Sequence, residues 1–497
     1  MARRWAVAAA VVVGCAGLAA AESEATAPPK PEAAPLAARF ADPVLFPVGR
    51  LGGALLGKRV TEIRAFSAVG GSLAPIAVQI DERTPDGQLV LTQGKGKGQI
   101  KDKDGDWVLA PNLGVVTAED EVILRAVDAG PRVPSDAWPL GAAEVAEVKI
   151  ADPATGREGF VYLAGYEIAA PPQPEADFVR YEVTHDRARD FDVEHVWSPR
   201  YHVAFSNPEA PFAYSDLQIS PTDDGRGYGP DLLDEFRFLI SINPFWINFT
   251  FRTENIAPER FGQIDGPIRV VRRIHLKVKF LGITIPEFLV KALTDIELDT
   301  DSFYYPEYFY FSGNLAVPGF IIERGDDAYG VFVTDFSDRM KGARWWNNLN
   351  PDGGAVVDGH MSEGERNLNK GFADYLAVSG PDGGWMNVLT FGEGFRKVHT
   401  ELYYADNALD TPTDEEEDAP EFKRAYGATG YRLSDFTTID PKKPMGFQTF
   451  IFALPPNLPT GGEAAYLRVL QSPLTATAGE RRRPAPSAVG EAPGVGY

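Results

Sequence analysis

The sequence predicts an all-β protein with two β-sandwich-like domains, the second of them larger, and few short helices. Short segments rich in aliphatic and β-branched residues recur along the chain, and Gly, Pro or Asp separates them. The clearest segment alternates strictly between apolar and charged residues, as a strand with one buried face does. The 497 residues are enough for about two or three domains of ordinary size.

The first 21 residues have the order of a secretory signal peptide. Two arginines precede an apolar run, and small residues end at Ala21. The apolar run is too short to span a bilayer as a retained helix. Cys15, the only cysteine, ends a lipobox-like Val-Val-Gly-Cys, so cleavage after Ala21 and lipidation of Cys15 both stay open. We expect an exported protein that is periplasmic, outer-membrane-associated or extracellular.

The first predicted domain covers residues 40–168 and follows a flexible leader, residues 22–39, that is rich in Ala, Pro and Glu. Turn residues follow each strand that we expect, which indicates an antiparallel sandwich. The expected strands are Val60–Phe66, Pro75–Ile80, Gln88–Leu91, Glu121–Ala126 and Val145–Ile150.

The second predicted domain covers residues 178–456, after a Pro-rich linker at residues 169–177. Its expected elements include a late core strand, Phe447–Leu454, and a short helix, Ile285–Leu293. The acidic run Asp414–Asp418 predicts a solvated loop. Residues 457–497 predict a C-terminal extension that is disordered from Ala478 onward, because that end is rich in Pro, Gly, Ala and Arg.

The formal charge of −22 excludes a general affinity for nucleic acid, since such a surface repels phosphates and anionic lipids overall. After the signal segment, no apolar run is long enough for a transmembrane helix. The chain also lacks a P-loop, a nucleophile elbow, a dinucleotide fingerprint and a haem-attachment motif.

A calcium site is the first candidate for a functional group. Asp102, Asp104 and Asp106 alternate beside Gly105, and Glu119 follows a short loop later. Clustered carboxylate oxygens suit Ca²⁺, which would have a structural role here. The order does not match an EF-hand, and Asp-Gly is also ordinary turn chemistry, so a simple turn is the alternative.

Two segments carry residue types that acid/base chemistry on a uronate polysaccharide would need. A lyase needs a cation against the carboxylate, a base for the C5 proton and an acid for the leaving oxygen. Arg200, Tyr201 and His202 supply these types, as do His399 and Tyr403. The alternative is that these residues form ordinary hydrogen bonds at strand ends, and their spacing does not indicate a metal site.

A basic strip is predicted on the alternating segment Arg273–Phe280, where Arg273, His275 and Lys277 share one face. One interpretation is an anionic ligand. The other is that the acidic face of the next segment, Asp295–Asp301, pairs with these residues across the sheet.

Aromatic clusters are the last candidates. Sugar rings stack on exposed aromatic faces, and neighbouring Asn side chains can bind hydroxyls, which Trp345, Trp346, Asn347 and Asn348 could provide. Burial in the core is the alternative for the Trp pair. For Phe303–Phe311, burial is the interpretation that we favour.

Three short motifs, Ala74–Arg83, Glu119–Gly130 and Asp265–Arg273, resemble exported bacterial β-rich proteins of uncharacterised function. The resemblance implies an envelope or extracellular location and no particular activity. Together with the aromatic clusters, it leads us to expect non-catalytic recognition of a polysaccharide or envelope glycan. A polysaccharide lyase or hydrolase is one alternative, and a structural or surface-assembly protein with an envelope protein partner is the other.

Overall fold

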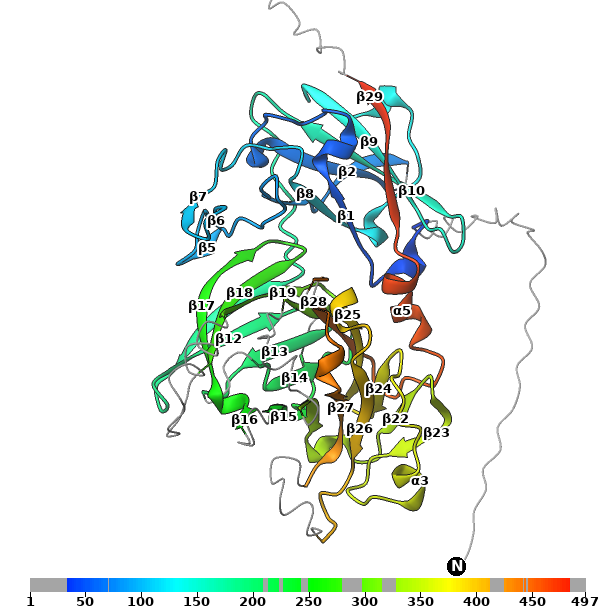
Figure 1. The fold of residues 1–497 in the computed structure, drawn as a ribbon. Helices are drawn as coiled ribbons and strands as arrows, with labels where there is room; N and C mark the ends of the chain where they lie inside the picture. The colour runs from blue at the N-terminus through cyan, green and yellow to red at the C-terminus, as the bar shows by residue number, and fades with distance from the viewer. Residues whose placement is uncertain are drawn as a thin grey trace, which may run out of the picture. The chain divides into compact units, whose positions relative to one another are not determined.

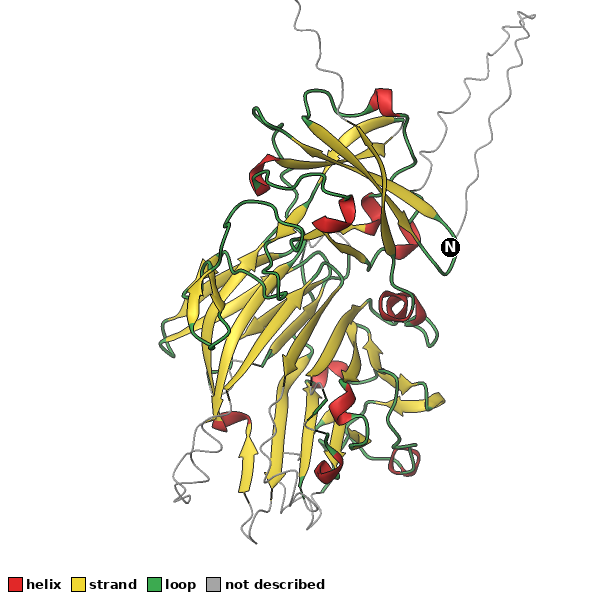
Figure 2. Cartoon of the chain, turned by 45° about the horizontal axis from the view of Figure 1, so that its top comes forward, coloured by secondary structure: helices red, strands yellow, loops and turns green. Residues whose placement is uncertain are grey.

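The computed structural model describes residues 34–69, 71–208, 213–222, 227–242, 249–278, 297–314, 328–411, 424–440, 442–443 and 446–482. Strands joined by turns account for most of them, and the helices are short (Figure 2). The predicted all-β, sandwich-like fold class is therefore confirmed. Within these ranges, no helix combines the length and apolar character that a membrane crossing needs.

The first part of the chain and its last strand, β29, form two antiparallel sheets, in the orders β1-β8-β4 and β29-β9-β10-β2-β3 (Figure 1). Aliphatic side chains from both sheets pack into one core, because alternate residues of each strand point to the same side. The strands are β1 (Pro43–Pro47), β2 (Ile63–Val69), β3 (Ser72–Ile76), β4 (Gln79–Asp81), β8 (Glu121–Arg125), β9 (Glu144–Ala151), β10 (Glu158–Gly165) and β29 (Thr475–Arg482).

The predicted strands of this part are mostly present. Those expected at Glu121–Ala126 and Val145–Ile150 correspond to β8 and β9, and Val60–Phe66 begins as a single helical turn, η3 (Val60–Glu62), before β2. The expected Gln88–Leu91 strand is wrong. Only Leu89 pairs there, in an isolated bridge with Arg83. Burial of Leu89 and Leu91 against other segments explains the apolar pattern without a strand.

The C-terminal end of the described chain corrects our expectation of disorder from Ala478. After helix α5 (Ala464–Gln471), β29 pairs with β9, and Ala478 lies opposite Val148. The strand is mostly exposed, and it is held by ladder bonds and by contacts of Arg481 with Glu144 and with the Gly52 carbonyl. Because an exposed edge strand needs no apolar face, its sequence resembles that of a disordered tail.

Three further sheets and a two-stranded hairpin of β6 (Gln99–Lys101) and β7 (Trp107–Leu109) complete the described fold. The orders of the three sheets are β11-β12-β13-β14, β16-β15-β21-β27-β26 and β23-β22-β24-β25-β28-β20-β19-β18-β17-β5. The strands are β5 (Gln93–Gly94), β11 (Arg180–Asp186), β12 (Phe191–Trp197), β13 (Tyr201–Phe205), β14 (Asp216–Ile219), β15 (Leu233–Ile242), β16 (Phe249–Arg252), β17 (Ile256–Asp265), β18 (Val270–Val278), β19 (Glu297–Tyr304), β20 (Tyr308–Asn314), β21 (Tyr329–Phe336), β22 (Arg344–Asn347), β23 (Asn350–Val356), β24 (Leu376–Gly380), β25 (Gly383–Phe391), β26 (His399–Ala405), β27 (Tyr426–Ser434) and β28 (Gly446–Leu454).

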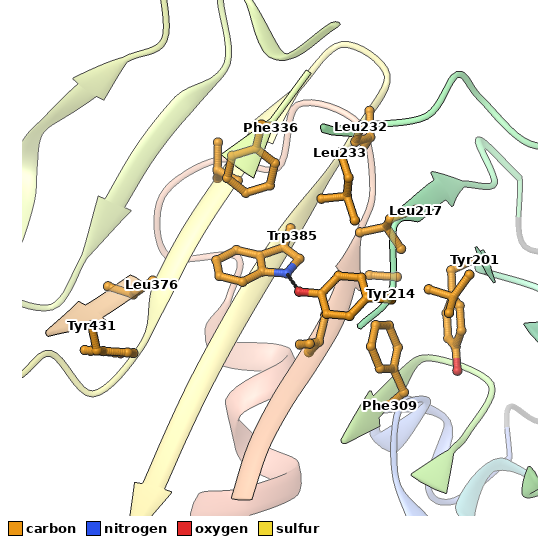
Figure 3. Packing of buried hydrophobic residues seen from close by; sticks show 14 of the residues in the cluster. Tyr201, Tyr214, Leu217, Leu232, Leu233, Phe309, Phe336, Leu376, Trp385 and Tyr431 are labelled. Carbon is orange, nitrogen blue, oxygen red and sulfur yellow. Dashed lines mark hydrogen bonds between the residues drawn. The ribbon is translucent and has the colours of Figure 1, made fainter. Parts of the chain in front are cut away.

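Large aromatic side chains fill the core between these sheets. Figure 3 shows Trp385 donating its indole N–H to the Tyr214 hydroxyl at 3.3 Å, next to Phe309 and Leu217. Buried indole and phenol groups need such partners, because an unbonded polar atom in a core is costly. The late core strand that we predicted at Phe447–Leu454 is β28, and its second half is buried.

The first part of the chain reaches the ten-stranded sheet through β5. Gly94 pairs with Gly262 of β17, and a further core joins Leu89 and Leu91 to Phe261 and Val271. Residues 169–177 form no helix or strand. The division into two domains at this linker stays a prediction. The expected Ile285–Leu293 helix and the Asp414–Asp418 loop lie outside the described residues.

Candidate functional site

The basic segment of β18 is paired with the acidic segment of β19. In the antiparallel backbone register, Arg273 is opposite Asp301, His275 is opposite Asp299 and Lys277 is opposite Glu297. Arg273 donates from Nε to Asp301 Oδ1 at 2.7 Å and from Nη2 to Oδ2 at 2.8 Å. This bidentate pair is the cross-strand arrangement that the alternating charges predict. Arg273 is therefore neutralised within the protein.

His275 belongs to an aromatic cluster. Its ring centroid lies 4.2 Å from that of Phe261 and 5.6 Å from that of Trp107. Trp107 in turn lies 4.3 Å from Phe261. Trp107 begins β7 (Trp107–Leu109), which pairs with β6 (Gln99–Lys101) as a hairpin. His275 thus helps to hold this hairpin against β17 and β18.

A cleft of about 660 Å³ opens where the hairpin meets the ten-stranded sheet. Its lining combines apolar rings, side-chain amides and charged groups, with Arg273 and Asp301 among them. The lining residues are Arg83, Asp86, Gly87, Gln88, Leu89, Lys101, Trp107, Arg273, Asp301, Phe303, Ser312, Gly313, Thr390, Phe391, Gly392, Gly446, Phe447 and Gln448. We call this the Trp107 cleft.

Hydrogen bonds fix the wall of the Trp107 cleft. Gln88 Nε2 donates to Asp86 Oδ2 and to the Lys101 carbonyl, each at 2.7 Å, and Gln88 Oε1 accepts the Lys101 N–H at 2.9 Å. The Lys101 ammonium lies 5.2 Å from the centroid of the Trp107 ring, within cation–π range. Hydrogen bonds from Thr84 and Gln88 lower the pKa of Asp86, so this carboxyl is ionised at neutral pH.

Sequence reasoning singled out Arg273 from this cleft but missed Trp107, Gln88 and Gln448. These three come from distant segments: Gln448 lies on β28 of the ten-stranded sheet, Trp107 lies on β7 of the hairpin, and Gln88 lies outside the strands. The available signal was the position of Trp107 immediately after the Asp-Gly turn, at the start of a short strand.

The predicted calcium ligands Asp102, Asp104 and Asp106 form the turn between β6 and β7. Asp102 Oδ1 accepts the N–H of Asp104 at 2.9 Å and that of Asp106 at 3.0 Å, which is Asx-turn geometry. Glu119 is exposed on a separate loop. In the part of the chain that is described, no group of three or more His, Cys, Asp or Glu side chains is arranged to hold a metal ion. Calcium binding at these residues stays a prediction.

His202 lies on β13, largely buried, within a hydrogen-bonded row. His195 Nδ1 is 3.1 Å from His202 Nε2, and His202 Nδ1 is 2.9 Å from Gln218 Oε1. Trp197 stacks on the His202 ring with centroids 3.6 Å apart. Burial lowers the pKa of His202 to about 4. Both ring nitrogens are engaged with protein, so neither faces a substrate.

Arg200, Tyr201 and His202 do not converge on one point. Tyr201 is fully buried and its hydroxyl donates to the Tyr305 carbonyl at 2.8 Å, and burial raises its pKa well above the ordinary range. Arg200 donates from Nε to Glu307 Oε2 at 2.8 Å. Adjacent residues of a strand point to opposite faces, which separates Tyr201 from His202.

His399 and Tyr403 lie on β26, in a different sheet from His202. His399 is exposed, and its Nε2 is 2.8 Å from Glu401 Oε1 on the same strand. Because His399 and Tyr403 are four positions apart on one strand, their backbones are about 13 Å apart. The structure brings together neither of the two predicted sets of acid/base residues.

Trp345 and Trp346 lie on β22 and are buried, with relative exposures of 0% and 1%. The Trp345 indole N–H donates to Thr429 Oγ1 at 3.1 Å, and that of Trp346 donates to Glu463 Oε2 at 3.2 Å. Neither ring offers a face to solvent, so the exposed-platform interpretation does not fit their placement.

The asparagines after the Trp pair form hydrogen bonds within the protein. Asn347 is buried, and its Oδ1 accepts the N–H groups of Leu349 and Asn350, each at 2.9 Å. Asn348 is exposed and donates from Nδ2 to Asp374 at 3.0 Å. The aromatic run Phe303–Phe311 is mostly buried, as its core interpretation predicts.

Comparison with known proteins gives only distant likenesses, and these are to solved structures. No family model matches the chain, and no curated protein matches it. Among solved structures, the chain is similar to an α-mannosidase from Enterococcus faecalis V583, with 11% sequence identity and a TM-score of 0.37. The likeness covers 86% of this chain and 41% of that chain, so this chain matches less than half of that protein's length.

Proposed function

We propose that this protein is an exported binding protein that recognises a neutral glycan, without cleaving it, in the Trp107 cleft. The observation that carries the proposal is the combination of a part-exposed indole with side-chain amides around one open cleft. Ligand sites generally combine apolar walls with a few placed polar groups.

The lining of the cleft suits a sugar ring. Trp107, Phe391 and Phe447 are partly exposed and supply apolar ring surface for the C–H face of a sugar. Thr390 and Gln448 are exposed and supply hydroxyl and amide groups for the hydroxyls at its edge. Gln88 donates a hydrogen bond to Asp86 and so holds its carboxylate in place within the cleft. Less conformational entropy is therefore lost when a ligand binds.

The charges of the cleft favour a neutral ligand over a uronate. Asp301 neutralises Arg273, and Arg83 contacts Glu121 with an N–O distance of 3.1 Å. Lys101, the remaining cation of the lining, lies over the Trp107 ring, and Asp86 adds an exposed negative charge. An anionic sugar would therefore gain little here and would be repelled by the strong negative charge of the chain.

The carboxylates of the cleft also favour binding of a glycan over its cleavage. A glycosidase needs one carboxyl group that stays protonated and a second that is free to act as base or nucleophile. Asp301 is held by Arg273, and hydrogen bonds keep Asp86 ionised. Among the residues that line the cleft, histidine, tyrosine and glutamate are absent.

The export of this binding protein is part of the proposal. Its support is the signal-like order of residues 1–21, which lie outside the described residues, and the acidic composition suits an extracellular or envelope setting. A surface-assembly protein with an envelope protein partner is the outcome that remains if no glycan binds.

Affinity electrophoresis of the chain through gels that contain neutral or anionic polysaccharides tests the proposal. We expect retardation by a neutral polysaccharide and no cleared track. Gln448→Ala should weaken binding by about three- to tenfold, since one hydrogen bond contributes roughly 0.5–1.5 kcal/mol. Gln93→Ala, which removes an exposed glutamine outside the cleft, is the matched control and should bind like the parent.

Trp107→Ala should abolish measurable retardation, and Trp107→Phe should retain part of it, because the apolar face is kept. Circular dichroism of both variants checks that the hairpin still folds. Retardation that survives both Trp107→Ala and Gln448→Ala would exclude the cleft, and a cleared track would make the protein an enzyme.

A further inference from the structure

The segment Gln93–Gly98 presents lysines outward for a steric reason. A Cβ at Gly94 would lie 2.5 Å from the Gly262 Cα, and one at Gly96 would lie 2.0 Å from the Phe261 ring. Glycine is therefore required at these positions, where the backbone presses on β17. The alternation Gly-Lys-Gly-Lys-Gly consequently places Lys95 and Lys97 on the exposed side.

Apolar side chains gather beside these lysines. Leu109 is 72% exposed, Leu113 is 47% exposed and Val108 is 39% exposed. Of the large apolar side chains that are exposed in the described residues, three thus fall within six positions. The position that a Cβ would take at Gly98 is 3.2 Å from Leu113 Cδ1 and 3.9 Å from Leu109 Cδ2, so these two leucines lie together over Gly98.

Cations flank the leucines on two sides. Lys97 precedes Gly98 and is exposed. Arg59, also exposed, forms an isolated bridge with Val115, two residues beyond Leu113. Two half-buried carboxylates lie beside these residues: Glu82 accepts the Gly114 N–H, and Glu62 accepts the Arg59 N–H at 3.0 Å. Lys95 contacts Glu259, with 2.8 Å between Lys95 Nζ and Glu259 Oε1.

We propose that the surface formed by Lys97, Leu109, Leu113 and Arg59 docks onto an anionic lipid surface. Exposed leucines flanked by cations are the combination that enters the headgroup region, since the leucines gain burial and the cations meet lipid phosphates. Figure 1 shows β5, β6 and β7, which carry or adjoin these residues, side by side.

Charge complementarity favours lipid as the occupant. The chain as a whole has a formal charge of −22, so an anionic membrane repels most of its surface. Contact is favourable only where cations gather. A polyanionic chain such as a nucleic acid would use the cations but would gain nothing from Leu109 and Leu113. The aspartates Asp102, Asp104 and Asp106 lie at the opposite end of the hairpin from Gly98, because β6 and β7 separate them.

Vesicle flotation tests this proposal and does not depend on the glycan proposal. Every variant carries Cys15→Ser and the same N-terminal segment, so any lipid affinity of that segment is common to all of them. The parent should float with vesicles of phosphatidylglycerol and phosphatidylcholine, more weakly with phosphatidylcholine alone, and less as salt is raised.

Leu109→Ser combined with Leu113→Ser should lower the apparent affinity by about tenfold or more, and Lys97→Glu by about fivefold. Leu140→Ser is the matched control, because Leu140 is 77% exposed and lies outside this surface. It should bind vesicles like the parent. Equal flotation of the double variant and the parent would overturn the proposal, as would a requirement for Ca²⁺, which would move the contact to the aspartates of the hairpin turn.

A second measurement covers the case in which the double variant does not fold. Leu109→Cys in the Cys15→Ser background is labelled with an environment-sensitive dye, and Leu140→Cys is labelled in the same way. Anionic vesicles should shift the emission of the dye at position 109 to shorter wavelength and leave that at position 140 unchanged. A parent that does not float, or dyes that respond equally, would overturn the proposal and leave this surface to a protein partner.

Discussion

His195 and His202 are joined ring to ring across two neighbouring strands, with 3.1 Å between His195 Nδ1 and His202 Nε2. The bond is the middle of a row that crosses four strands. Thr184 Oγ1 lies 2.8 Å from His195 Nε2 at one end, and Gln218 Oε1 lies 2.9 Å from His202 Nδ1 at the other.

The row has a consistent direction when both rings are neutral. Gln218 Oε1 accepts only, so His202 carries its proton on Nδ1 and accepts at Nε2. His195 then donates from Nδ1 and accepts the Thr184 hydroxyl at Nε2. A proton added at His202 Nε2 would face the N–H of His195, so protonation opposes the arrangement that the fold holds.

The first prediction concerns the acid side of the stability curve. Burial lowers the pKa of His202 to about 4, while the unfolded chain titrates near 6.5. The unfolded state therefore takes up more protons between these values, and the free energy of unfolding falls as pH falls from 6.5 to about 4. The loss from His202 should approach about 3 kcal/mol.

His202→Gln removes this titration, so urea unfolding across that pH range should show a shallower fall than in the parent. His185→Gln is the control, because His185 is exposed and Asp192 raises its pKa. Parallel curves for the parent and His202→Gln would contradict the prediction.

The second prediction has the opposite sign. Asp335 is buried beside Arg237, with 2.6 Å between Arg237 Nη2 and Asp335 Oδ2, and burial outweighs the ion pair and raises the pKa of Asp335 to about 7. The contribution of Asp335 to stability is complete below pH 3.8 and is lost as pH rises through 7.

Asp335→Asn should therefore make the free energy of unfolding less dependent on pH between 4 and 7, by an amount on the order of 2–4 kcal/mol. Denaturant midpoints measured at several pH values check this expectation. Asp338→Asn, at an exposed carboxylate two residues beyond the end of β21, should leave the profile unchanged. If the free energy of unfolding of Asp335→Asn depended on pH as that of the parent does, burial of Asp335 would not account for the pH dependence.

The sequence predicted the strand class well because alternation is a local property. The charges of Arg273 and Asp301 could be matched across strands before their register was known, since each segment shows its own two faces. The same reasoning failed at Ala478, where ladder bonds to β9 hold a strand that has no apolar face.

The candidate site was less predictable because distant segments build it. Trp107 and Gln448 lie 341 positions apart in the sequence and line one cleft only because β28 and β18 belong to the same sheet. The Trp pair misled in the opposite way. Local turn residues favoured an exposed loop, but the partners that bury Trp345 and Trp346, Thr429 and Glu463, come from β27 and the start of α5.

The third prediction tests whether Trp345 is a buried core residue or an exposed surface on which a sugar ring stacks. Trp345→Ala should lower the free energy of unfolding by about 3–5 kcal/mol, because it leaves a cavity and an unpaired Thr429 hydroxyl. Asn348→Ala, at an exposed side chain nearby, should cost less than about 1 kcal/mol. Thermal unfolding of both variants gives the comparison. Normal stability of Trp345→Ala together with lost glycan binding would restore the platform interpretation.

The fourth prediction tests calcium. If Asp102, Asp104, Asp106 and Glu119 bind a structural Ca²⁺, adding the ion stabilises the folded state by mass action and raises Tm, and a chelator reverses the gain. Asp104→Ala should remove the response, since the Asp102 turn alone offers too few oxygens. Asp136→Ala, at an exposed aspartate in the short helical turn η5 (Ser135–Ala137), controls for the general loss of negative charge. An unchanged Tm with chelator, together with no effect of Asp104→Ala, would leave the aspartates as a hairpin turn whose role is to position Trp107.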